Sequence, residues 1–99
     1  MQIRFKATVD GYSRFRIPKK YFKYFRLDAV YRVKYSVDKG GFREGMMQIV
    51  VYNPERRYIK GCIVQEGKQH RLIRVKFEKG TLIEVIYDTA IEPLEWWNL

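Results

Sequence analysis

The chain has few of the side chains from which enzymes and metal centres are usually built. Among its 99 residues there are one cysteine and one histidine, Cys62 and His70. A lone cysteine excludes an internal disulfide and favours a reducing, cytoplasmic setting. Two Cys or His ligands are too few for a structural zinc site, which usually takes four. We therefore expect a fold that stands on packing alone, with no metal and no cofactor.

Other absences narrow the functional class. No apolar run approaches the roughly 20 residues that a membrane-spanning helix needs, so no membrane association is expected. Gly40-Gly41 lacks the following helix and Lys-Ser/Thr of a phosphate-binding loop. Nucleophilic catalysis needs a base beside Ser or Cys. The one imidazole, His70, follows a turn and is expected in an exposed loop, with a Cys62–His70 pair as the alternative. We expect neither enzymatic activity nor a small-molecule substrate.

Basic charge is abundant and unevenly placed. The formal net charge is +9 at pH 7. Residues 1–39 hold eleven Lys or Arg against three acids, whereas no Lys or Arg follows Gly80. Such a charge split favours a polyanion as the partner of one face. The alternative is that the charge serves solubility.

An alternation of apolar and polar residues predicts a strand at the start of the chain. Its apolar positions are Ile3, Phe5, Ala7 and Val9. After a turn at residues 10–13 the pattern resumes, with Phe15 and Ile17 inward and arginines outward. Pro18 then fits the first position of a helix. We expect a short helix near residues 18–26, with aromatic rings docked on the sheet and lysines facing solvent.

Strands and tight turns are expected over the rest of the chain. The predicted strands cover residues 31–37, 47–52, 58–65, 70–77 and 81–87. Residues 53–56 form a turn by composition. Turn signals spaced about 8–12 residues apart favour a barrel or a sandwich. The predicted fold class is therefore mainly β, a small barrel or sandwich of short antiparallel strands with one short helix.

One domain is expected over residues 1–99. It divides into a basic hairpin and helix (1–37), a β-meander (45–88) and an acidic tail (89–99) that contains Trp96 and Trp97. An indole side chain carries roughly 200 Å² of surface, so this pair should be buried. We expect it to cover the domain's own core or a sheet edge, or to contact a partner such as a second subunit.

The segment KATVDGYSRFRIPKKYFKYFRLDAVYRVKY, residues 6–35, resembles the AbrB/MazE/SpoVT swapped-hairpin DNA-binding domains. The shared pattern is a strand, a turn ending in arginine, Ile-Pro, a brief helix and an alternating strand. The matching residues are Arg14, Ile17, Pro18, Lys23, Leu27, Val33 and Tyr35. Ser13, Phe22 and Val30-Tyr31 depart from the family's Gly, basic residue and Gly-Asp. The resemblance implies a homodimer that exchanges hairpins and contacts DNA near the turn and helix.

The expected function is non-enzymatic binding of nucleic acid by a dimeric regulator of transcription, with DNA favoured and RNA as the alternative. The side chains expected to contact phosphates are Arg4, Lys6, Arg14, Arg16, Lys19, Lys20 and Lys23. The alternative is a small structural or protein-interaction protein whose basic face serves solubility. The composition is similar to that of small proteins from viruses of hyperthermophilic archaea, which implies a host-cytoplasmic location and high thermal stability.

Overall fold

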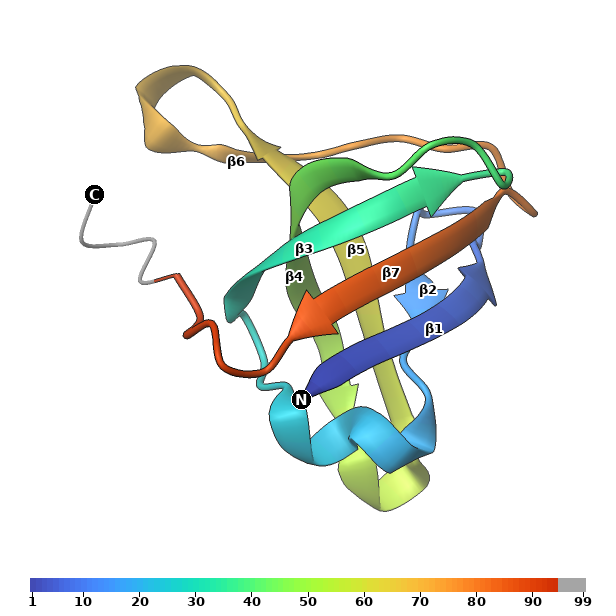
Figure 1. Ribbon diagram of the computed structural model, residues 1–99, viewed down its shortest axis with the longest axis vertical. Helices are drawn as coiled ribbons and strands as arrows, with labels where there is room; N and C mark the ends of the chain where they lie inside the picture. Colours follow the sequence, from blue (N-terminus) through green and yellow to red (C-terminus); the bar gives the residue numbers. More distant parts are fainter. Residues whose placement is uncertain (95–99) are drawn as a thin grey trace.

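Short antiparallel strands make up most of the structure, as the sequence predicts. The computed structural model describes residues 1–94, and the helices in that range are short 3-10 turns (Figure 1). The strands are β1 (Gln2–Thr8), β2 (Phe15–Arg16), β3 (Val30–Val37), β4 (Arg43–Asn53), β5 (Tyr58–Glu66), β6 (Leu72–Arg74) and β7 (Leu82–Asp88). The 3-10 helices are η1 (Lys19–Tyr24), η2 (Pro54–Arg56) and η3 (Lys68–His70). The prediction of a mainly β fold is confirmed.

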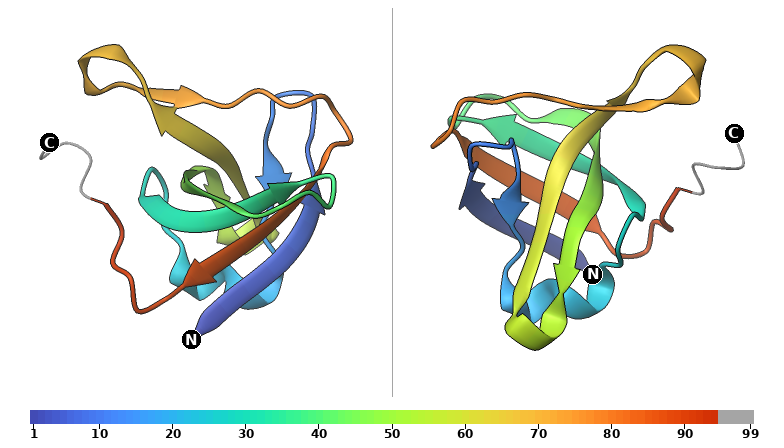
Figure 2. Two further views of the ribbon diagram at one scale, coloured as in Figure 1. Left: turned by 45° about the horizontal axis from the view of Figure 1, so that its top comes forward. Right: turned by 180° about the vertical axis from the view of Figure 1, so that it is seen from behind.

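One sheet connects the strands in the order β1-β7-β3-β4-β5-β2, and β6 pairs with the second half of β5. The sheet curls around its core until its end strands, β1 and β2, lie beside each other (Figure 2). In residues 1–94 no ladder of paired residues joins these two strands. The curled sheet therefore stops one ladder short of a closed barrel. We call the opening between β1 and β2 the seam.

The alternation in the sequence decides which side chains enter the core. Ile3 and Phe5 of β1 are buried, and so is Phe15 of β2. Their neighbours Lys6 and Arg16 are exposed. The basic residues of both strands consequently lie on the outer face of the sheet, as the sequence predicts.

The segment predicted as a helix is a 3-10 helix, which is shorter and tighter than residues 18–26 at α-helical spacing. Its rings pack against the core, and the following Phe25 is buried with its ring centroid 5.0 Å from that of Tyr31. Residues three apart eclipse each other in a 3-10 helix. Lys20 and Lys23 therefore share one side, and both are exposed. Docking of this segment by its rings is confirmed.

The prediction of a strand over residues 70–77 is mostly wrong. Only Leu72–Arg74 pairs with β5. Gln69 and His70 have positive φ angles of 59° and 57°, which are not those of a strand. The turn predicted before this strand therefore extends through His70. Beyond β6, one more backbone bond joins the Val75 N–H to the Ile63 C=O of β5 (2.9 Å). The hydroxyl of Ser13 then bonds to both the N–H and the C=O of Phe77.

Two other segments complete the sheet. β4 begins at Arg43, earlier than predicted, because residues 43–48 pair with β3. The turn predicted at residues 53–56 is confirmed and contains η2. After β7, Leu94 forms an isolated bridge with Val30. Trp96 and Trp97, expected to contact a partner, lie outside the described residues.

Candidate nucleic-acid interface

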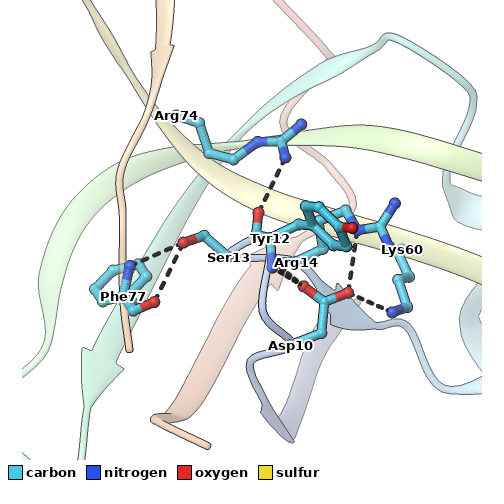
Figure 3. Close-up of polar contacts among 7 residues, drawn as sticks. All are labelled: Asp10, Tyr12, Ser13, Arg14, Lys60, Arg74 and Phe77. Atoms are coloured by element: carbon cyan, nitrogen blue, oxygen red, sulfur yellow. Dashed lines mark hydrogen bonds and ion pairs between the residues drawn. The ribbon is translucent and has the colours of Figure 1, made fainter. Parts of the chain in front are cut away.

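The turn between β1 and β2 is built around the carboxylate of Asp10. One oxygen accepts hydrogen bonds from the backbone N–H groups of Tyr12 (2.8 Å) and Arg14 (3.0 Å). The other oxygen pairs with the Arg14 guanidinium and the Lys60 ammonium (Figure 3). Burial disfavours the charged carboxylate, but Lys60 and the donors of Arg14 and Tyr12 outweigh it and hold the pKa of Asp10 well below its usual range. Asp10 is therefore ionised at neutral pH and orients both cations.

This turn gives Arg14 a partner within the chain. Its Nε lies 3.0 Å from Oδ2 of Asp10, and its guanidinium carbon is 5.0 Å from the centroid of the Tyr12 ring. The resemblance implies a DNA contact at Arg14. An arginine that is already paired with a carboxylate brings less net charge to a phosphate, so Arg14 is a weaker candidate than an arginine without an acidic partner.

The turn forms although Ser13 stands at the position where the swapped-hairpin pattern has glycine. The φ angle of Ser13 is 61°, in the left-handed region that glycine adopts most easily. The buried Oγ accepts a hydrogen bond from the Phe77 N–H (2.9 Å) and donates one to the Phe77 C=O (3.3 Å). These two bonds stabilise the unfavourable backbone conformation and tie the turn to the chain that precedes β7 (Figure 3).

Arg4 lies on the outer face of β1 and is held by β7. Its Nε forms an ion pair with Glu84, and its guanidinium carbon is 5.4 Å from the centroid of the Phe42 ring. Glu84 also stands directly opposite Lys6 in the β1–β7 register. Like Arg14, Arg4 therefore has an acidic partner in its own chain.

Three other predicted residues come together at the seam. Lys6 of β1, Arg16 of β2 and Lys19 of η1 line an open depression of about 460 Å³, together with Arg57 at the end of η2. All four side chains are exposed, and in residues 1–94 none of them has an ion-pair partner within 4.0 Å. We call this depression the seam groove. It gathers cations from four separate segments of the chain.

Arg57 is a site residue that the sequence pattern does not identify. It has a left-handed backbone (φ 56°) and closes η2 with a hydrogen bond from its N–H to the C=O of Pro54. The sequence predicts this turn, but it does not reveal that β5 then pairs with β2, with Lys60 opposite Arg16. That long-range pairing brings the turn beside the seam.

Lys20 and Lys23 extend the basic surface over η1. Their ammonium groups lie 5.1 Å and 5.2 Å from the ring centroids of Tyr21 and Tyr24, respectively. Neither lysine lines the seam groove. The seven predicted residues thus form three groups: Arg4 and Arg14 with acidic partners, Lys6, Arg16 and Lys19 at the groove, and two lysines on the adjoining helix.

A second depression, of about 640 Å³, lies over β3, β4 and β7. Its wall carries both signs of charge, including Arg32 and Lys34 against Glu44 and Asp88. Mixed charge does not favour a polyanion. Of these two depressions, the seam groove alone has cations and no acid in its wall.

Neither residue considered for catalysis, Cys62 or His70, lines the seam groove. Cys62 is fully buried, and burial raises the pKa of its thiol, which makes it a poor nucleophile. His70 is exposed, and its Nδ1 lies 2.8 Å from Oε1 of Glu66. Over residues 1–94 no three His, Cys, Asp or Glu side chains are grouped so as to hold a metal ion. No helix in this part of the chain is long and apolar enough to cross a membrane.

Comparison of the chain with protein-family models, with curated proteins and with solved structures finds no match. The similarity of residues 6–35 to swapped-hairpin domains is therefore carried by its motif residues alone.

Proposed function

We propose that the protein binds nucleic acid without catalysing a reaction, and that the seam groove is the centre of its binding surface. The observation that supports this proposal is the gathering of Lys6, Arg16, Lys19 and Arg57 around one recess with no acid in its wall. Like charges repel when they are held close together, and a bound phosphate relieves that repulsion. Lys20 and Lys23 on η1 provide a second row of cations for the flanking phosphates.

The resemblance of residues 6–35 to swapped-hairpin domains supports a more specific proposal. In that proposal the protein is a homodimeric regulator that binds DNA through two copies of this surface. Two grooves on one particle would bind one polyanion far more tightly than a single groove, because the second contact is intramolecular.

The salt dependence of binding tests this function. Neutralising phosphates releases counterions, so the logarithm of the binding constant should fall linearly with the logarithm of the salt concentration, by about 0.9 per phosphate contact on B-DNA and about 0.7 on a single strand. Fluorescence anisotropy with labelled oligonucleotides at several salt concentrations measures this slope. Lys19→Ala and Arg57→Ala should each make the slope shallower by nearly one contact.

Lys68→Ala is the matched control, because Lys68 is an exposed lysine in η3 that does not line the groove. It should leave the slope unchanged. If the parent protein does not bind any nucleic acid at low salt, or if Lys68→Ala has the same effect as Lys19→Ala, the proposal is wrong.

The alternative is a structural or protein-interaction role in which the basic face serves solubility. The observation in its favour is that the chain neutralises part of its own charge, since Glu84 pairs with Arg4 and Asp10 pairs with both Arg14 and Lys60. A failure of the parent protein to bind nucleic acid at low salt would favour this alternative.

A further inference from the structure

The shape of the seam groove limits the form of nucleic acid that it can hold. Duplex DNA is usually read by a helix or a β-ribbon that enters the major groove, which is about 12 Å wide. Here the cations surround a recess, and η1 has only six residues, whose rings pack on the core. The recess of about 460 Å³ falls in the range of small-molecule sites, roughly 300–1,000 Å³. The size of the recess is therefore closer to that of one nucleotide than to that of a duplex.

Backbone groups also face the seam. The Val9 N–H bonds to the Thr81 C=O, and the Thr89 N–H bonds to the Met1 C=O, so the odd-numbered residues of β1 bond to β7. Bonding alternates along an antiparallel strand, which turns the N–H and C=O groups of Lys6 the other way, toward β2.

The same rule applies to β2 on the other side of the opening. The Ile17 N–H bonds to the Ile59 C=O of β5, so the neighbouring Arg16 directs its backbone groups toward β1. No ladder forms between β1 and β2 among the described residues. Backbone N–H groups in such a position are donors for phosphate oxygens, beside the cationic side chains.

An aromatic residue and an arginine that can stack on a base are also part of the groove wall. The half-buried ring of Phe22 is part of its wall. Arg16 holds its guanidinium over the Tyr58 ring, 4.8 Å from the ring centroid. Bases that are not paired in a duplex stack on aromatic rings and on guanidinium planes in this way.

We infer that the seam groove binds single-stranded nucleic acid, with one unstacked nucleotide in the recess. Its phosphate lies among Lys6, Lys19 and Arg57, and its base stacks against Phe22. The inference rests on the proposed function and specifies its substrate class. A cationic groove combined with stacking rings is the general design of single-strand binding sites.

Anisotropy titrations of the full chain with two labelled ligands test the inference. One ligand is an oligo-thymidine of about 12 nucleotides, within the usual site size of small single-strand binding folds. The other is a DNA duplex with the same number of phosphates. At one fixed low salt concentration, the single strand should bind at least about tenfold more tightly than the duplex.

Phe22→Leu removes the ring and keeps an apolar side chain. It should weaken single-strand binding by about 5- to 150-fold, the range for loss of one stacked base, and leave duplex binding nearly unchanged. Because Phe22 also packs against the core, Arg57→Gln provides a second test at an exposed position. Arg32→Gln, an exposed arginine in the wall of the other depression, is its matched control.

The two ligands and the two arginine variants distinguish a failure of the inference from a failure of the proposed function. Tighter binding of the single strand, with a larger loss for Arg57→Gln than for Arg32→Gln, supports the inference. A duplex that binds as tightly as the single strand overturns the inference and leaves the proposed function standing. Equal losses for the two arginine variants overturn both the inference and the seam groove as the centre of the binding surface. If neither ligand binds at low salt, the proposed function is itself wrong.

Discussion

Replacing Asp10 by asparagine removes one negative charge from the β1–β2 turn while nearly preserving its shape. The amide oxygen can still accept hydrogen bonds from the N–H groups of Tyr12 and Arg14, which lie 2.8 Å and 3.0 Å from Oδ1. A neutral amide cannot replace the ion pairs that Oδ2 forms with the Arg14 guanidinium and the Lys60 ammonium. Lys60 is only 8% exposed, so its ammonium stays near the protein interior without a carboxylate.

The expected loss of stability follows from these ion pairs. A hydrogen bond to a charged group contributes about 1.5–3 kcal/mol, and breaking a buried ion pair by removing one partner costs about 3–5 kcal/mol. The side chain of Asp10 is 24% exposed, so water reaches part of the site and weakens the effect. Asp10→Asn should therefore lower the free energy of unfolding by about 2–3 kcal/mol at neutral pH.

This loss should depend on pH. The folded-state pKa of Asp10 is lowered, so the unfolded chain binds the proton more readily and the stabilisation is present above the unfolded pKa of about 3.9. It is lost as the pH falls from that value toward the lower folded-state pKa. The difference between the parent protein and Asp10→Asn should thus be about 1 kcal/mol smaller at pH 3 than at pH 7.

Urea titrations followed by circular dichroism, at one temperature for all variants, measure these differences. Glu55→Gln is the control, because Glu55 is an exposed acid on η2 and its replacement should change stability little. Lys60→Met should cost less than Asp10→Asn, since Asp10 keeps Arg14 and two N–H donors. The reasoning is refuted if Asp10→Asn costs the same at pH 3 as at pH 7, or no more than Glu55→Gln.

Four further predictions concern stability, assembly and reactivity. Ser13→Ala should lower the free energy of unfolding by about 1–3 kcal/mol, because it leaves the Phe77 N–H without its partner. Ser13→Gly loses the same bonds but relaxes the positive φ, so a urea titration in which it costs more than the alanine variant would contradict this account. Light scattering should give about twice the 12.0 kDa chain mass, and a monomer mass at micromolar concentration would exclude the dimer. Calorimetry should give a melting temperature above about 90 °C, against which unfolding near 50 °C would count decisively. Cys62 should react with thiol reagents only on unfolding, and rapid labelling of the native protein would show that its burial is transient.

The sequence predicts those parts of the fold that local pattern controls. Alternation identifies β1, β3 and β7 to within one or two residues, because one face of each strand is buried and the other exposed. It fails at residues 70–77, where the apolar alternation continues but, among residues 1–94, the ladder with β5 ends at Arg74. A strand needs a neighbour, and the neighbour is decided by the whole topology.

For the candidate site, too, the sequence predicts local properties and does not predict long-range ones. Which residues are exposed and basic is a local property, and the sequence identifies Lys6, Arg16 and Lys19 correctly as outward-facing. Which of the basic residues have acidic partners is a long-range property. Arg4 is separated from Glu84 by 80 positions in the sequence, and Lys60 from Asp10 by 50. The periodicity of the sequence does not reveal these long-range ion pairs. It also does not reveal that Arg57 lies at the seam.

The open seam has a consequence for how this protein behaves at high concentration. A strand edge without a partner is a template for pairing with another chain, and proteins commonly guard such edges with charged side chains, lysine in particular. Lys6 and Arg16 stand on the two strands that border the opening. When two molecules approach each other by this edge, the repulsion between these cations on the two molecules opposes the edge-to-edge association that leads to aggregation. The charges that we propose for polyanion binding would therefore also oppose edge-to-edge pairing of the open seam.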